Sequence, residues 1–159
     1  MNKTLRYTAA IAAIAAIALL SACASNKTAT DNNAVKTVDV TNGIGADGVP
    51  APQARSVYFD LDRYTVRTDG QPVVRAHSEF LNKNRNQHVL LQGNTDERGT
   101  AEYNLALGQR RSEAVKNAMS ALGVNTSQIE AVSLGKEKPK AQGSNEAAWA
   151  ENRRVDFVY

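Results

Sequence analysis

An uncharged apolar run near the start of the chain, followed closely by the only cysteine, constrains the fold more than any other feature. The run covers the twelve residues 9–20 and comes after Lys3 and Arg6. A membrane-spanning helix needs about 20 residues, and a basic start before a short apolar run is typical of a secretory signal. We therefore expect residues 1–22 to be a signal peptide, which leaves room for one folded domain.

The segment Leu20–Cys23 resembles the lipobox of bacterial lipoproteins, whose cysteine is acylated and becomes the first residue of the mature protein. As the sole cysteine, Cys23 cannot form an internal disulfide. We expect it to carry the lipid. Because Ala24, and not aspartate, follows it, the resemblance implies delivery to the outer membrane. The protein should then be lipid-anchored at the periplasmic face of that membrane.

The composition separates a tether from a folded domain. Residues 24–55 are rich in Asn, Thr, Asp, Gly and Pro, so we expect residues 23–55 to form a lipidated flexible tether and residues 56–159 to form the domain. Removal of the signal leaves 17 basic against 16 acidic residues, which does not favour nucleic-acid binding. Two histidines and an acylated cysteine do not make an ordinary zinc site, and no cofactor is indicated.

Strand and helix patterns alternate along the domain. Short β-branched and aromatic runs predict strands, and apolar residues at helical spacing predict helices. The strands are expected at 56–60, 89–91, 129–134 and 154–159, and the helices from about Pro72 to Leu81, over 103–122 and over 146–152. This order predicts an α+β sandwich (β-α-β-α-β-α-β), with one mixed sheet and helices packed on one face. His77 and Trp149 are expected to pack in the core.

The stretch Gly93–Arg111 closely resembles the signature of OmpA-like peptidoglycan-binding domains. Val57–Tyr64, Ser133–Pro139 and Asn152–Arg154 extend the resemblance over residues 56–159, toward the branch of this family that works in the Tol-Pal system. The resemblance implies non-covalent binding of the diaminopimelate-containing stem peptide of peptidoglycan. That binding would tether the outer membrane to the cell wall, in support of envelope integrity and cell division.

The resemblance also implies partners. The periplasmic propeller protein TolB is the principal one, and other Tol proteins or OmpA are further candidates. The alternative is a related OmpA-like wall-binding lipoprotein outside the Tol-Pal system, with the same ligand but without these protein partners.

The charged groups of the proposed ligand are complementary to charged residues of this sequence. Diaminopimelate presents an ammonium and a carboxylate on one carbon, so a receptor needs an anion and a cation close together. Asp96 follows a strand and Arg111 lies about two turns into the next helix, so a loop that folds back can join them. Aspartate accepts from ammonium and arginine offers a planar fork to carboxylate. Backbone amides at the helix start near Asn104 would add donors.

By resemblance, Asp62, Asp96 and Arg111 match the principal ligand positions of the family, and Asn104 and Arg154 match supporting ones. From the residues alone, a structural role stays open: Asp96 could cap a turn, and Arg111 could pair with a neighbouring glutamate on a solvated surface. The substitution Arg111→Ala should remove a bidentate contact with the ligand and cost several kcal/mol of binding free energy, while it barely changes stability.

A cell-wall hydrolase is the rival class. Several carboxylates could in principle pair as general acid and base. The sequence has no Gly-x-Ser-x-Gly elbow, no Cys–His pair after acylation and no His-rich metal motif, so it offers no activated nucleophile. We therefore expect a binding protein and not an enzyme.

Overall fold

A computed structural model describes residues 49–51 and 54–159. Four strands and three α-helices alternate in the expected order: β1 (Ser56–Tyr58), α1 (Gln71–Lys83), β2 (Val89–Asn94), α2 (Ala101–Ala121), β3 (Ile129–Gly135), α3 (Glu146–Asn152) and β4 (Arg154–Val158). Single 3-10 turns at Thr68–Gly70 and Thr126–Gln128 precede α1 and β3. Among the described residues, no helix is long and apolar enough to span a membrane.

The four strands form one mixed sheet in the order β1-β4-β2-β3. Strands β2 and β3 are parallel and are joined through α2, whereas β4 runs antiparallel to both β1 and β2. A parallel pair needs a crossover connection, and α2 provides it. The predicted mixed sheet is confirmed.

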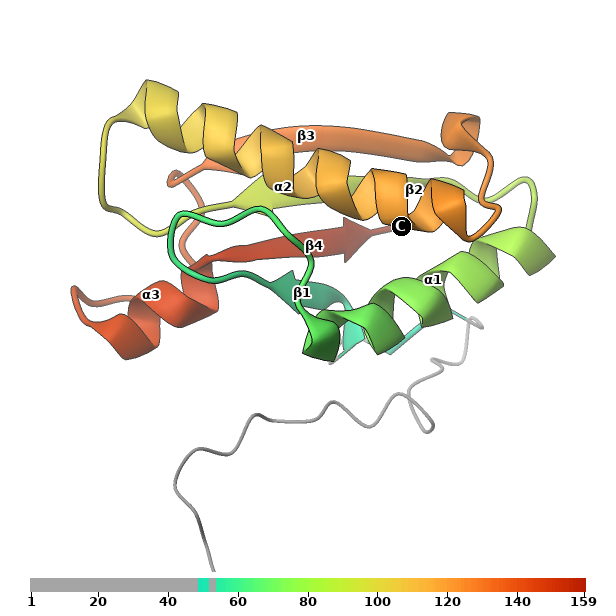
Figure 1. Cartoon of the computed structure of the whole chain (residues 1–159), viewed down its shortest axis with the longest axis horizontal. Coiled ribbons are helices and arrows are strands. Elements are labelled where there is room, and N and C mark those ends of the chain that lie inside the picture. Colours follow the sequence, from blue (N-terminus) through green and yellow to red (C-terminus); the bar gives the residue numbers. More distant parts are fainter. Residues whose placement is uncertain (1–48, 52–53) are drawn as a thin grey trace, which may run out of the picture. The chain divides into compact units, whose positions relative to one another are not determined.

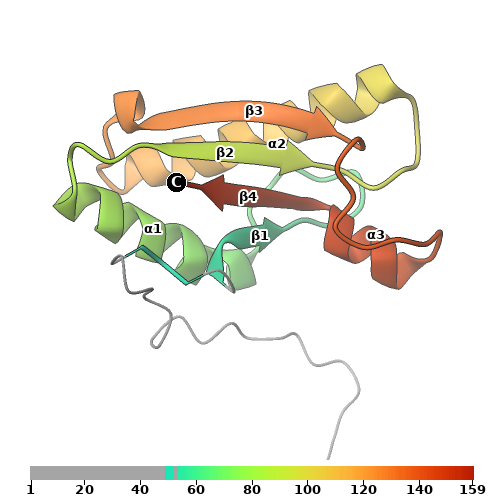
Figure 2. The same ribbon diagram turned by 180° about the vertical axis from the view of Figure 1, so that it is seen from behind.

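Helices α1 and α2 cover one face of the sheet, which Figure 1 shows from the helix side and Figure 2 from the open side. The short helix α3 leads directly into β4 and lies beyond the end of the sheet at which β4 begins (Figure 1). The expected α+β architecture is therefore confirmed, with the two long helices on a single face.

The hydrophobic core lies between this face and the two helices. Strand alternation points every second side chain inward, so Val155 and Phe157 of β4 meet Val57 of β1 and Leu91 of β2. His77 of α1 is fully buried as predicted, and its ring stacks on Phe157 with centroids 3.9 Å apart.

The side chain of His77 also joins the start of the domain to its end. One ring nitrogen lies 3.0 Å from the carbonyl oxygen of Ala54, and the other lies 2.8 Å from the hydroxyl oxygen of Tyr159. A carbonyl can only accept, so Nε2 donates to Ala54 and Nδ1 accepts from Tyr159. Val49 and Ala54 are both buried, so residues ahead of β1 pack on the domain.

Two elements differ from the sequence prediction in ways that matter for the site. Strand β2 continues to Asn94, three residues beyond the predicted end, because Gly93 remains in register with β3 and β4. Helix α2 begins at Ala101, two residues early, where the Thr100 side chain accepts a hydrogen bond from the Tyr103 amide. The loop between them is therefore only six residues long, Thr95 to Thr100.

Candidate functional site

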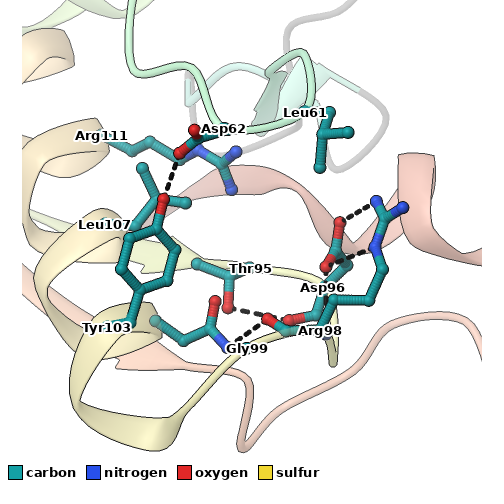
Figure 3. A pocket seen from close by; sticks show the side chains of 10 residues that line it. Leu61, Asp62, Thr95, Asp96, Arg98, Gly99, Tyr103, Leu107 and Arg111 are labelled. Atoms are coloured by element: carbon teal, nitrogen blue, oxygen red, sulfur yellow. Dashed lines mark hydrogen bonds and ion pairs between the residues drawn. The ribbon is translucent and has the colours of Figure 1, made fainter.

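A pocket of about 380 Å³ opens where β2 ends and α2 begins. Three segments line it: the loop after β1, the loop after β2 and the first turns of α2 (Figure 3). The lining residues are Leu61, Asp62, Thr95, Asp96, Arg98, Gly99, Tyr103, Asn104, Leu107 and Arg111. Four of the five ligand residues expected from the sequence are thus brought together.

Arg111 reaches the pocket from α2 and is fully buried. Its guanidinium donates to three backbone carbonyl oxygens, those of Arg63 (2.8 Å), Asn94 (2.9 Å) and Asp60 (3.1 Å). Because these bonds use three of the five N–H donors of a guanidinium, two remain. The alternative that Arg111 pairs with a glutamate on a solvated surface is therefore wrong: its side chain holds the β1–α1 loop against the end of β2.

The charge of Arg111 forms no ion pair with any of the described residues, 49–51 and 54–159. Burial, and then the nearby charge of Arg153, lower the pKa of Arg111 to about 10, while Asp96 opposes the shift. The side chain is still protonated at neutral pH, so a buried cation borders the pocket. An anion that entered there would be stabilised.

Asp96 follows β2 and is 5% exposed. Its carboxylate accepts hydrogen bonds from the amide (3.1 Å), Nε (3.2 Å) and Nη2 (2.6 Å) of Arg98, and from Nη1 of Arg153 (3.4 Å). Burial alone would raise the pKa of Asp96, but the Arg98 hydrogen bonds outweigh it and lower the pKa. Asp96 is therefore a fixed anion at neutral pH.

Asp62 lies on the opposite rim, in the loop after β1. It is exposed and has a φ of 55°, the left-handed region that aspartate tolerates better than most side chains. The hydroxyl of Tyr103 donates to its carboxylate, which raises the pKa of Tyr103 (Figure 3). This bond joins the β1–α1 loop to the first turn of α2 across the pocket mouth.

Asn104 is buried in the first turn of α2, and its side chain fixes the loop between β2 and α2. Its Nδ2 donates to the carbonyl of Arg98 at 2.7 Å. Its backbone amide donates to Thr100, as does the amide of Tyr103 to the Thr100 hydroxyl. These two helix-start amides are already bonded and are not available to a ligand carboxylate.

Arg154 is the one expected site residue that does not line the pocket. On β4 its Nε pairs with Asp156 at 3.0 Å, and its Nη2 donates to the carbonyl of Lys138. The preceding Arg153 reaches Asp96 instead. Consecutive residues at the start of a strand point to opposite sides, so only one of the two arginines can face the site. Arg154 therefore makes no contact in the pocket that would let it support ligand binding there as expected.

The sequence patterns did not identify Arg98 as a residue of the site or Trp149 as its neighbour. The Arg98 guanidinium lies 4.0 Å from the centre of the Trp149 ring, and the indole N–H donates to the carboxylate of Glu97 at 3.0 Å. Trp149 is therefore a half-buried neighbour of the pocket and not a core residue, contrary to the prediction. The Asp-x-Arg spacing of Asp96 and Arg98 was a usable signal, since aspartate often bonds the backbone two residues on.

The comparisons with known proteins place this geometry in a family. The OmpA family matches residues 58–153, which contain every pocket residue. The chain is 42% identical to the peptidoglycan-associated lipoprotein of Pasteurella multocida over 90% of this chain and 91% of that one. It is 40% identical to that of Haemophilus influenzae over the full length of both. The chain belongs to the peptidoglycan-associated lipoproteins of the OmpA family.

A solved structure agrees with this assignment. The crystal structure of the peptidoglycan-associated lipoprotein from Burkholderia pseudomallei superposes with a TM-score of 0.66 at 59% identity, covering 69% of this chain and 93% of that one. The resemblance to the OmpA family seen in the sequence is confirmed. As a peptidoglycan-associated lipoprotein, the chain is a lipoprotein of the cell envelope.

Proposed function

We propose that this protein binds peptidoglycan non-covalently through the pocket between β2 and α2, and so ties the outer membrane to the cell wall. The observation that carries the proposal is the buried guanidinium of Arg111, which borders the pocket without an ion pair among the described residues. A buried charge is costly unless it is paired. A ligand carboxylate is the partner that this cation lacks.

The charges around the pocket fit the head of diaminopimelate. The two N–H groups that remain on Arg111 would donate to its carboxylate, and the carboxylates of Asp96 and Asp62, which line the same pocket, would accept from its ammonium. Asn104 supports the site indirectly through its bond to the Arg98 carbonyl. Leu61 and Leu107 supply apolar walls for the aliphatic stem of the ligand.

The same geometry supports binding rather than hydrolysis. A general acid needs a carboxyl that is protonated near neutral pH, which requires a raised pKa. The pKa of Asp96 is lowered by its arginine partners. The residues that line the pocket include neither histidine nor cysteine.

We propose that the protein reaches the wall from the periplasmic face of the outer membrane. The acyl chains on Cys23 would anchor it, and residues 24–48 would span the gap between membrane and wall, because Val49 and Ala54 are already buried on the domain. Cys23 lies outside the described residues, so the support is the lipobox-like sequence and the membership of the family. Each buried CH₂ of an acyl chain contributes about 0.8 kcal/mol, which makes attachment by several chains long-lived.

TolB is the protein partner that we propose, within the Tol-Pal system; other Tol proteins and OmpA remain candidates. The pocket rim carries two exposed apolar side chains, Leu61 (55%) and Tyr103 (43%). Exposed apolar residues that cluster beside a polar pocket are typical of a protein-binding surface. A partner on this rim would cover the pocket, so wall binding and TolB binding should exclude each other. A wall-binding lipoprotein without Tol partners is the alternative.

The test is co-sedimentation of the full-length protein, in mild detergent, with purified sacculi that contain diaminopimelate, beside sacculi that contain lysine at the same position. We expect selective pelleting with the diaminopimelate wall. The variant Asp62→Asn should pellet far less, since it loses the rim anion but keeps the backbone conformation. Asp69→Asn, in the 3-10 turn before α1 and outside the pocket, is the control and should pellet normally. Equal pelleting with both walls would contradict the proposed ligand.

A further inference from the structure

The carboxylate of Asp96 has no acceptor site left for a ligand. Its Oδ1 accepts from the amide and Nε of Arg98, and its Oδ2 accepts from Nη2 of Arg98 and Nη1 of Arg153. A carboxylate offers about four lone-pair sites, and all are used here. An ammonium that is to bond Asp96 must therefore replace one of these donors.

The side chain of Arg98 is the donor that can leave. Arg153 is held on all sides: its side chain is 8% exposed, and it also bonds Glu146 at 2.6 Å and the carbonyl of Phe59 at 3.2 Å. The side chain of Arg98 is 35% exposed and lines the pocket directly (Figure 3). Its pair with Asp96 is thus the one that opens at the lower cost.

Two contacts would hold Arg98 after it leaves Asp96. Its guanidinium lies over the Trp149 ring at 4.0 Å, and its Nη1 is 3.9 Å from the carboxylate of Glu146. Neither contact involves Asp96, so the guanidinium can turn away from Asp96 while it stays on the indole. Cation–π stacking on tryptophan is favourable but weaker than an ion pair with a buried carboxylate. Glu146 is 65% exposed and already bonds Arg153 at 2.6 Å, so it compensates the displaced charge only weakly.

We propose that Arg98 determines the specificity of the pocket, because it occupies the cation position at Asp96 and yields it only to a ligand that brings both an ammonium and a carboxylate. The ammonium replaces the guanidinium at Asp96, and the ligand carboxylate lies between Arg98 and Arg111. A stem peptide with lysine brings an ammonium alone and leaves the displaced Arg98 with only the exposed Glu146, which Arg153 already bonds. The pocket then discriminates against the lysine peptide because binding of that peptide leaves a poorly compensated charge on Arg98. This inference rests on the proposed function.

The test compares two soluble tripeptides that differ only at the third residue, meso-diaminopimelate or lysine, by calorimetry on the full-length protein in mild detergent. We expect Arg98→Gln to lower the ratio of the two affinities by about tenfold or more, because the lysine peptide no longer competes with an internal cation. Arg85→Gln removes one charge from the exposed turn after α1 and should leave the ratio unchanged. An unchanged ratio in Arg98→Gln, or an equal loss for both peptides, would overturn the inference.

Trp149 provides an independent signal, because it is the only tryptophan of the chain. Movement of Arg98 on the indole should change its fluorescence as the diaminopimelate peptide binds, with a midpoint at the calorimetric Kd, and Arg98→Gln should abolish the change. Binding without any fluorescence change in the unaltered protein contradicts the movement of Arg98 and leaves the proposed function intact. If the folded, unaltered protein binds neither peptide, the proposed function itself fails and this inference fails with it.

Discussion

Gly93 of β2 and Gly108 of α2 meet backbone to backbone: a Cβ atom on Gly93 would lie 1.9 Å from the carbonyl oxygen of Gly108. The helix can cross the strand this closely because neither residue has a side chain. The contact lies next to the site, since Arg111, one turn further along α2, donates to the carbonyl of Asn94, the residue after Gly93. The crossing of strand and helix therefore sets the position of the buried cation.

Gly93→Ala should destabilise the protein by about 3 kcal/mol, because backbone atoms of α2 must move to admit the methyl group. Urea unfolding measures this loss. Gly123→Ala is the comparison: its φ of 89° makes alanine strained, but the added methyl group would lie 3.8 Å from the nearest atom, Nδ2 of Asn82, so about 1 kcal/mol is expected. Equal losses for the two variants would contradict the steric origin.

Arg111→Ala should cost about 4 kcal/mol of stability, which corrects the expectation from sequence. The substitution removes the donors of three backbone carbonyls and leaves a cavity in a fully buried position. Arg110→Ala, the exposed neighbour, should change the free energy of unfolding by no more than about 0.5 kcal/mol. A stable Arg111→Ala variant would mean that the side chain does not hold the loop.

Asp62→Gly should weaken wall binding and leave stability unchanged or raised by about 1 kcal/mol. Glycine adopts the left-handed conformation at 55° without strain, but it has no carboxylate for a ligand ammonium. Thermal unfolding and sacculus co-sedimentation measure the two effects separately. A loss of binding that came only with a loss of stability would point to a structural role for Asp62.

The stability of the protein should fall in mild acid because of His77. Burial is the main reason that its pKa is lowered from 6.5 to about 4, and the charge of Arg55 adds to the effect. As the pH falls below 6.5, His77 binds a proton in the unfolded chain but not in the folded chain. The free energy of unfolding therefore decreases until the pH reaches the pKa of His77 in the folded state, about 4. The loss between about pH 7.5 and about pH 5 should be about 2 kcal/mol.

The comparison for this pH effect is the exposed His88. The free energy of unfolding of His88→Gln should keep the same dependence on pH, since the side chain of His88 is exposed at the surface of the domain. In His77→Phe the decrease between the two pH values should be much smaller, although the variant starts from a lower stability. The same decrease in His77→Phe would assign the effect to other groups.

Patterns of neighbouring residues were enough to locate the elements. The apolar spacing from Val73 to Leu81 marks one face of α1, and the alternation of Val155 and Phe157 marks the inner face of β4. Local patterns work here because periodicity reports which side of an element is buried. The ends of β2 and α2 were less accurate, since pairing with β3 and β4 and capping by Thr100 decide them.

By itself, the sequence determined the order of strands and helices, the family, and the presence of Asp96 and Arg111 on either side of one loop. Only the tertiary structure decided that Arg153 and not Arg154 reaches Asp96, that Arg111 is buried against three carbonyls, and that Trp149 lies beside Arg98. The physical reason is that these contacts join segments that are far apart in the chain. Their geometry depends on strand register and helix crossing, which local periodicity does not report.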